Sequence, residues 1–293
     1  MSNEPTEYIE LRKKRDFSAV ISTGFQFIRQ NWKELYRPLV FICLPIYLVA
    51  SVFFGSFFRT MYAGQSSGNV GMILSGMGSM LLGYVLMGIS MLLLYAMVFE
   101  YMRFYMVNKG MKPTMGELWK EVKGQLGAYF VIGLLVSFIT SAGLILFIVG
   151  ALWLAIVFVM AFPLRAFERA DIGDCIGRSF TVIKGNWWRT FALVVILGMM
   201  VSFIGYIIYL PFVLLTGFGA MSGVESMNDP SAMGERMGWL MTGLMIASGV
   251  MYVLLLPLLQ VPIALHALSL IEEKEGRGLM DRVNELQVTP KAS

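Results

Sequence analysis

The sequence predicts an all-α, polytopic transmembrane helical bundle of about six spans, built from repeated units of one amphipathic helix and a helical hairpin. Of the 293 residues, 57% are apolar and only 14% are charged, whereas soluble domains are usually about half apolar and about a quarter charged. The charged residues leave five long stretches that carry none, at 38–58, 60–99, 124–164, 190–224 and 237–271. Because a helix needs about 20 apolar residues to cross a bilayer, this pattern excludes a soluble enzyme and a disordered chain.

The charge-free stretches predict six spans, at about 39–58, 79–102, 124–140, 144–164, 191–215 and 239–270. The stretch 124–164 must hold two helices, and Ser141-Ala142-Gly143 is its predicted turn. The Gly- and Ser-rich residues 64–78 and the segment 217–234 are predicted to be loops on the outer side.

The distribution of basic residues predicts the orientation of the chain. Six helices divide the hydrophilic segments into two sets, and 21 of the 23 Lys and Arg residues fall in the set that contains both termini. Only Arg59 and Arg236 fall in the other set. Since positive charge gathers on the cytoplasmic side, we expect polar cytoplasmic segments at 1–16 and 272–293, a membrane domain at 17–271 and no cleaved leader.

Two polar stretches of the sequence are alike. Residues 21–32 read ISTGFQFIRQNW and residues 176–187 read IGRSFTVIKGNW. The shared motif is F-x-x-I-R/K-x-N-W. It comprises Phe25, Ile28, Arg29, Asn31 and Trp32 in the first copy and Phe180, Ile183, Lys184, Asn186 and Trp187 in the second. A weaker copy runs through residues 115–126, so the repeat units are expected at about 17–102, 112–167 and 172–271.

The repeated helix is predicted to be amphipathic. In the copy before the fifth span, apolar residues recur at spacings of three and four, and basic residues flank them. The apolar face either lies in the lipid, with basic residues toward anionic head groups on the cytoplasmic face, or packs under the bundle. Asn31 and Asn186 are expected at helix ends. Membrane lipids are therefore the expected partners, with another membrane protein as a second candidate. The net charge of +4 is not taken as a sign of nucleic-acid binding.

This motif before a hairpin, repeated along a six-span chain, resembles a loose group of bacterial inner-membrane proteins. They are similar to the membrane region that is attached to some glycerophosphodiester phosphodiesterases. The resemblance covers most of the chain but includes no counterpart of the phosphodiesterase catalytic domain. It implies a multi-pass location in the bacterial inner membrane, and it carries over no catalytic residue.

Ionisable side chains within spans are candidate functional residues. Glu100 lies near the cytoplasmic end of the second span, and Arg103 follows one turn later on the same helix face. A structural ion pair between these two residues is the favoured interpretation, with a proton relay as the alternative.

The sixth span contains the densest polar chemistry, with Pro257, Gln260, Pro262 and the single histidine, His266. Two prolines should bend or break the helix, and broken helices often line transport sites. Gln260 and His266 would then contact a polar ligand or carry a proton. The favoured alternative is that Gln260 bonds to a neighbouring helix and His266 lies at the membrane interface.

The function predicted from these features is a non-enzymatic scaffold, assembly or regulatory factor for other membrane components. The alternative is a transporter or lipid-handling permease whose sixth span lines the pathway. No catalytic set, metal site or cofactor is predicted, because Cys43 and Cys175 have no ligand-spaced neighbours. The feature that separates the two functions is whether Gln260 and His266 face a water-filled cavity or lipid.

Overall fold

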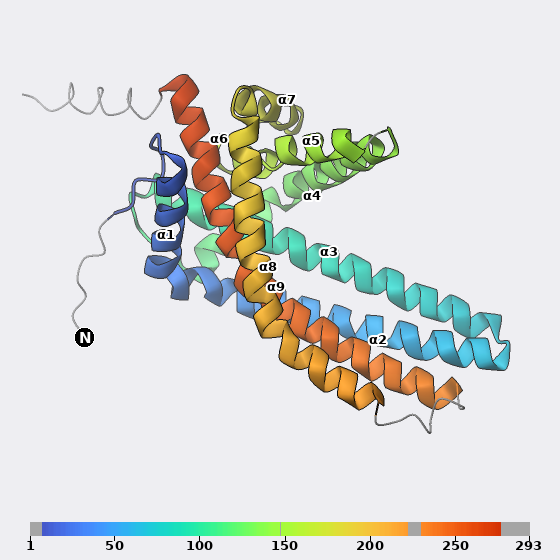
Figure 1. Ribbon diagram of the computed structural model, residues 1–293. Helices are drawn as coiled ribbons and strands as arrows, with labels where there is room; N and C mark the ends of the chain where they lie inside the picture. The colour runs from blue at the N-terminus through green and yellow to red at the C-terminus, as the bar shows by residue number, and fades with distance from the viewer. Residues whose placement is uncertain (1–7, 147, 222–229, 277–293) are drawn as a thin grey trace, which may run out of the picture. The chain divides into compact units, whose positions relative to one another are not determined.

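The computed structural model describes residues 8–146, 148–221 and 230–276, and the regular structure in these ranges is helical, which confirms the predicted all-α bundle. The elements are α1 (Phe17–Pro38), the π-helical turn η1 (Leu39–Cys43), α2 (Leu44–Ser67), α3 (Val70–Val107), α4 (Met115–Leu146), α5 (Ile148–Phe158), α6 (Ala161–Glu168), α7 (Ile172–Ile183), α8 (Trp187–Met221) and α9 (Pro230–Glu275) (Figure 1). Within the described ranges, six helical segments are long and apolar enough to cross a membrane. The chain is accordingly a multi-pass membrane protein.

The chain forms two compact units. Within the described residues, unit 1 consists of 8–35, 95–146, 148–198 and 257–276. Unit 2 consists of 36–94, 199–221 and 230–256. Helices α3, α8 and α9 each contribute one part to each unit. Unit 1 contains α4 to α7 and the charged residues of the site described below.

Unit 2 shows that one predicted loop was wrong. Residues 64–78 are helical except at Gly68 and Asn69, where Gly68 adopts a left-handed φ of 64° between α2 and α3. The small residues serve close packing instead, because a Cβ on Gly76 would lie 2.6 Å from the Thr60 hydroxyl across the hairpin. Figure 1 shows α2 and α3 side by side.

Two further turns lie elsewhere than predicted. Residues 141–143 are helical, and α4 continues to Leu146 before α5 begins at Ile148. A Cβ on Gly143 would lie 3.3 Å from the Ala151 Cα, so this glycine permits close contact between the two helices of the hairpin. In the predicted loop 217–234, residues 217–221 and 230–234 are helical, and 222–229 lie outside the described residues.

Apolar side chains of α1 and α7, the helices predicted to be amphipathic, are packed inside unit 1. Helix α7 buries Ile183 against Ile156, Val157 and Phe158 of α5. Helix α1 buries Phe27, whose ring meets those of Tyr101 and Tyr105 on α3 edge-on. These contacts favour packing under the bundle over insertion of the apolar faces into lipid.

The matching motif positions differ in their surroundings. Ile28, Asn31 and Ile183 are buried, Phe25, Asn186 and Trp187 are half-buried, and Arg29, Trp32, Phe180 and Lys184 are exposed. The prediction that Asn31 lies at a helix end is wrong, because this residue lies inside α1. Its amide donates to the Phe27 carbonyl oxygen (2.9 Å) and accepts from the Tyr101 hydroxyl (3.1 Å). Asn186 does precede the first residue of α8, and its carbonyl accepts from the Thr190 N–H.

Replacing Gly24 of α1 with alanine tests the packing of α1 on α9. A Cβ at this position would lie 2.7 Å from Pro262 Cγ and 3.3 Å from Pro262 Cα. Because the proline ring is rigid, we expect Gly24→Ala to lower the free energy of unfolding by about 1–2 kcal/mol. The control is Gly177→Ala on α7, where a Cβ meets no atom within 4 Å. Because alanine has the higher helix propensity, this variant should raise the free energy of unfolding by up to about 1 kcal/mol. Detergent-micelle unfolding followed by circular dichroism measures both; stabilisation by both variants would contradict the close contact.

Candidate functional site

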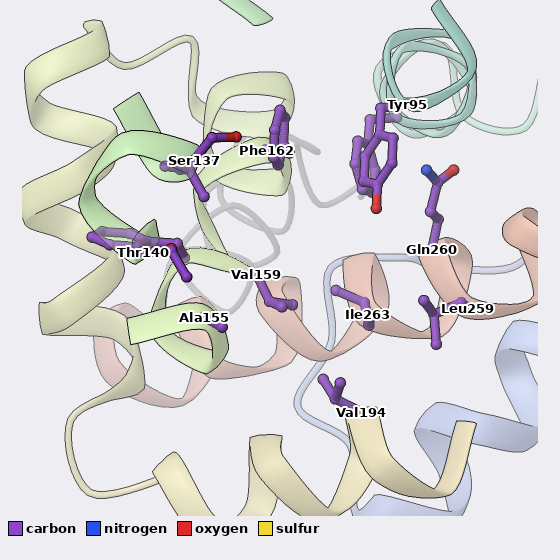
Figure 2. A pocket seen from close by; sticks show the side chains of 13 residues that line it. Tyr95, Ser137, Thr140, Ala155, Val159, Phe162, Val194, Leu259, Gln260 and Ile263 are labelled. Atoms are coloured by element: carbon purple, nitrogen blue, oxygen red, sulfur yellow. The ribbon is translucent and has the colours of Figure 1, made fainter. Parts of the chain in front are cut away.

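Unit 1 contains a cavity of about 340 Å³ between α3, α4, α5, α6, α8 and α9, here called the Gln260 cavity (Figure 2). Its volume is within the range of about 300–1,000 Å³ that is usual for small-molecule sites. Most of the lining side chains are apolar. They are Phe99, Val136, Ala155, Phe158, Val159, Phe162, Val194, Leu259 and Ile263.

Four polar side chains complete the lining, namely Tyr95, Ser137, Thr140 and Gln260. Gln260 is only 1% exposed, and neither the nitrogen nor the oxygen of its amide has a hydrogen-bond partner in the part of the chain that the structure describes. Figure 2 shows Tyr95 beside Gln260. The tyrosine hydroxyl interacts with the amide, but no hydrogen bond joins them. The buried Thr140 Oγ1 also lacks a partner among the described residues.

An unpartnered buried amide is unfavourable. Leaving such a group without hydrogen bonds costs about 1–3 kcal/mol in proteins, and nearly all buried polar groups are hydrogen-bonded for this reason. In the Gln260 cavity the unpartnered amide lies next to a space large enough for another molecule. This arrangement makes the Gln260 cavity a candidate binding site, with Gln260 as its candidate polar anchor.

Helix α9 presents Gln260 without a break. The sequence predicts that Pro257 and Pro262 bend or break this helix; they do not break it, since α9 is continuous from Pro230 to Glu275. Pro262 is instead packed against Gly24 of α1. A proline at this position needs no broken helix, because neighbouring helices can support the turn that has lost its N–H donor.

His266 does not line the cavity. It is buried in unit 1, and its Nε2 lies 2.9 Å from the Thr190 hydroxyl of α8. The prediction that His266 lies at the membrane interface stays a prediction, since these contacts do not locate the side chain relative to the bilayer. Of the two candidate pathway residues in the sixth span, only Gln260 faces a cavity.

Glu100 is in an ion pair, but with a different arginine from the one predicted. The Arg169 guanidinium donates to both carboxylate oxygens of Glu100, at 3.0 and 2.8 Å, and the Tyr129 hydroxyl donates to the same carboxylate at 3.2 Å. Arg103 contacts Glu121 of α4 instead, at 3.3 Å, and Arg169 contacts that carboxylate as well, at 2.9 Å. Two hydrogen bonds from one arginine to a fully buried carboxylate are typical of an ion pair that stabilises the fold, and they favour this interpretation over a proton relay.

The ion pair is connected to the cavity through aromatic rings. Tyr129, which donates to Glu100, is stacked on Phe162 with ring centroids 6.1 Å apart. Phe162 in turn lies 5.2 Å from the Tyr95 ring. Both Phe162 and Tyr95 line the Gln260 cavity, so the charged cluster positions one wall of the site.

Arg169 was missed by the sequence analysis. It follows α6 in a left-handed conformation with a φ of 53°, which directs the chain from α6 toward α7. The only local signal was its position in the basic segment 165–189. Arg178 in the same segment is held between Glu168 and Glu275, and the hydrogen bond to Glu168 raises the pKa of the Arg178 guanidinium.

The two cysteines are free and buried. Burial raises the pKa of the Cys175 thiol to about 11, so that thiol is protonated at neutral pH and is a poor nucleophile. Among the described residues no group of three or more His, Cys, Asp or Glu side chains could hold a metal ion.

Comparison with protein-family models, with curated proteins and with solved structures finds no match for this chain. The resemblance to the membrane regions of phosphodiesterases therefore stays a prediction. The function has to be argued from the site itself.

Proposed function

We propose that this protein is a non-enzymatic, lipid-handling membrane protein that holds an amphiphilic molecule in the Gln260 cavity. The function corresponds to the alternative predicted from the sequence, in which the sixth span lines the pathway. The observation that carries it is the Gln260 amide, which is 1% exposed, has no hydrogen-bond partner among the described residues and borders a cavity of about 340 Å³.

The surroundings of Gln260 support an amphiphile over a water-soluble substrate. Nine of the thirteen lining residues are apolar, and the cavity lies within helices long enough to span a membrane. The polar groups of a water-soluble solute would find few hydrogen-bond partners on such a surface, whereas an acyl or alkyl chain would make apolar contacts with it. Ligand sites in general combine such apolar walls with a few well-placed polar groups.

A scaffold or assembly role, which the sequence favoured, stays a prediction. Apolar side chains of α1 and α7 pack within unit 1, and the surface of these helices that is left for a partner combines basic residues with the exposed rings of Trp32 and Phe180. Arg29 and Lys184 are exposed on it. They are suited to anionic lipid head groups or to an acidic segment of a membrane-protein partner.

Lipid analysis of the purified protein tests the proposal. We expect the protein, extracted from native membranes in a mild detergent, to retain a small amphiphile that mass spectrometry detects, and Gln260→Leu to lose most of it. The control is Thr242→Val, which removes a buried polar group of α9 in unit 2 that is satisfied by the Gly238 carbonyl. A stoichiometric protein partner without any retained small molecule would contradict the proposal and favour the scaffold.

We also propose that the protein lies in a bacterial inner membrane with both termini in the cytoplasm. The positive charge on the polar segments supports this orientation, since 21 of the 23 basic residues belong to the set that includes both termini. A reporter that is active only outside the cytoplasm should be silent when fused after Ser293. An active reporter would contradict the topology.

A further inference from the structure

We propose that the ligand of the Gln260 cavity is an uncharged amphiphile with one polar group that both donates and accepts a hydrogen bond, such as a hydroxyl or a primary amide. The inference rests on the proposed function and specifies the class of ligand. It is drawn from the polar groups that lack partners, from the charge of the lining and from the size of the cavity.

The unpartnered groups define the hydrogen bonds that the ligand must make. The Gln260 amide offers two N–H donors and one carbonyl acceptor. None of them forms a hydrogen bond among the described residues, although the Tyr95 hydroxyl lies beside the amide and interacts with it. Thr140 of α4, on another wall of the cavity, offers a hydroxyl that also lacks a partner there. A ligand hydroxyl or amide can accept from the Gln260 nitrogen and donate to an oxygen of either side chain. An ether or an ester could only accept, and would leave the Gln260 oxygen unpaired.

The charge of the lining argues against an ionic ligand. Among the described residues, none of the thirteen that line the cavity carries a charge at neutral pH. The nearest acidic residue along α3, Glu100, is fully buried and already bonded to Arg169 and Tyr129. An ion in the cavity would be desolvated without a counter-charge, which is highly unfavourable in an apolar environment.

The volume limits how much of the ligand the cavity can hold. At about 30 Å³ for each atom-sized group, the volume that a water molecule occupies in the liquid, a cavity of about 340 Å³ holds roughly ten non-hydrogen atoms. That is a short-chain amphiphile or one end of a longer lipid. The rings of Phe99, Phe158 and Phe162 form much of the wall, so the chain would lie against flat aromatic surfaces.

Competition binding to the full chain in lipid nanodiscs tests the inference. The probe is decanol carrying a photoreactive diazirine, and cross-linked peptides are identified by mass spectrometry. The competitors are decanol, decane, decyl sulfate and decyltrimethylammonium, with the two ionic surfactants below their critical micelle concentrations. We expect cross-links in the peptides that contain Val136 to Thr140 or Leu259 to Ile263. Decanol should compete at least tenfold better than decane and than either ion.

Two variants show whether the polar groups cause this preference. In Gln260→Leu, decanol should lose its advantage over decane while decane still competes. Thr140→Val should reduce the advantage without abolishing it, because the Gln260 amide stays in place. If Gln260→Leu does not fold, Gln260→Asn provides the test, since it keeps the amide but shortens its reach and should weaken decanol alone.

The outcomes separate the inference from the proposed function. Equal competition by decane and decanol in the unaltered protein would overturn the uncharged hydrogen-bonding ligand but leave a lipid-handling cavity. Stronger competition by either ion would overturn it in the same way. Cross-links that avoid both cavity peptides would overturn the proposed function as well.

Discussion

Replacing Arg169 with leucine is expected to lower the free energy of unfolding by about 3–5 kcal/mol, the usual cost of breaking a buried ion pair on one side. Arg169 makes two hydrogen bonds to the carboxylate of Glu100, which is 0% exposed. Without the guanidinium, the buried carboxylate would keep one hydrogen bond, from the Tyr129 hydroxyl, and the charge of Arg103, which bonds to Glu121 instead. Unfolding in mixed micelles, followed by circular dichroism, measures the change.

The matched control for this variant is Arg103→Leu. Arg103 bonds to Glu121, whose side chain is 38% exposed, and pairs that solvent reaches contribute only about 0–1 kcal/mol. In the Arg169→Leu background, the further change Glu100→Gln should restore part of the stability because it removes the buried charge. Equal losses of unfolding free energy in Arg169→Leu and Arg103→Leu would show that the Glu100–Arg169 pair stabilises the fold no more than the Arg103–Glu121 pair does.

Arg169→Leu should also reduce ligand retention by the Gln260 cavity. The Glu100 carboxylate accepts from Tyr129, which is stacked on the cavity residue Phe162. Loosening the ion pair is therefore expected to loosen one wall of the site.

Replacing Gln260 with leucine is expected to stabilise the fold, in contrast to the loss expected for Arg169→Leu. In protein freed of bound lipid, Gln260→Leu is expected to raise the free energy of unfolding by about 1–2 kcal/mol. The substitution removes an amide that is buried without hydrogen bonds, and such a group carries a desolvation penalty of about 1–3 kcal/mol. Leucine also fills part of the apolar cavity beside Leu259 and Ile263. The same micelle unfolding measures this gain, and the loss of ligand retention should accompany it.

Asn31→Leu is the matched control, because Asn31 is a second carboxamide that is only 1% exposed. Unlike Gln260, it is hydrogen-bonded to the Phe27 carbonyl and to the Tyr101 hydroxyl. Its removal leaves the Tyr101 hydroxyl without that acceptor, and we expect a loss of about 1–3 kcal/mol. If both carboxamides were needed for folding, the two variants would lose stability alike, and Gln260 would not be a ligand-binding residue.

The span composition and the all-α class could be predicted from the sequence, whereas the favoured interpretation that Gln260 bonds to a neighbouring helix is not what the described residues show. Long charge-free stretches fix the number of candidate spans, because the bilayer imposes a minimum apolar length on each of them. Gln260 stood out because a polar amide within an apolar span is unfavourable unless it is used.

The partners and turns could not be predicted, because they depend on contacts between distant parts of the chain. Arg103 is one turn from Glu100 on the same helix, yet Arg169, 69 residues away, bonds to that carboxylate. Gly76 and Gly143 read locally as loop and turn residues, but they occur where neighbouring helices approach closely. A glycine favours both situations, and only the tertiary structure separates them.

The most direct test of the proposed ligand site is a cryo-electron microscopy map of the protein, extracted from native membranes into polymer nanodiscs without detergent and bound to an antibody fragment. We predict elongated non-protein density in the Gln260 cavity, with one end at hydrogen-bonding distance from the Gln260 amide. A map in which the cavity is closed and the Gln260 amide is hydrogen-bonded to the protein would contradict the proposed function.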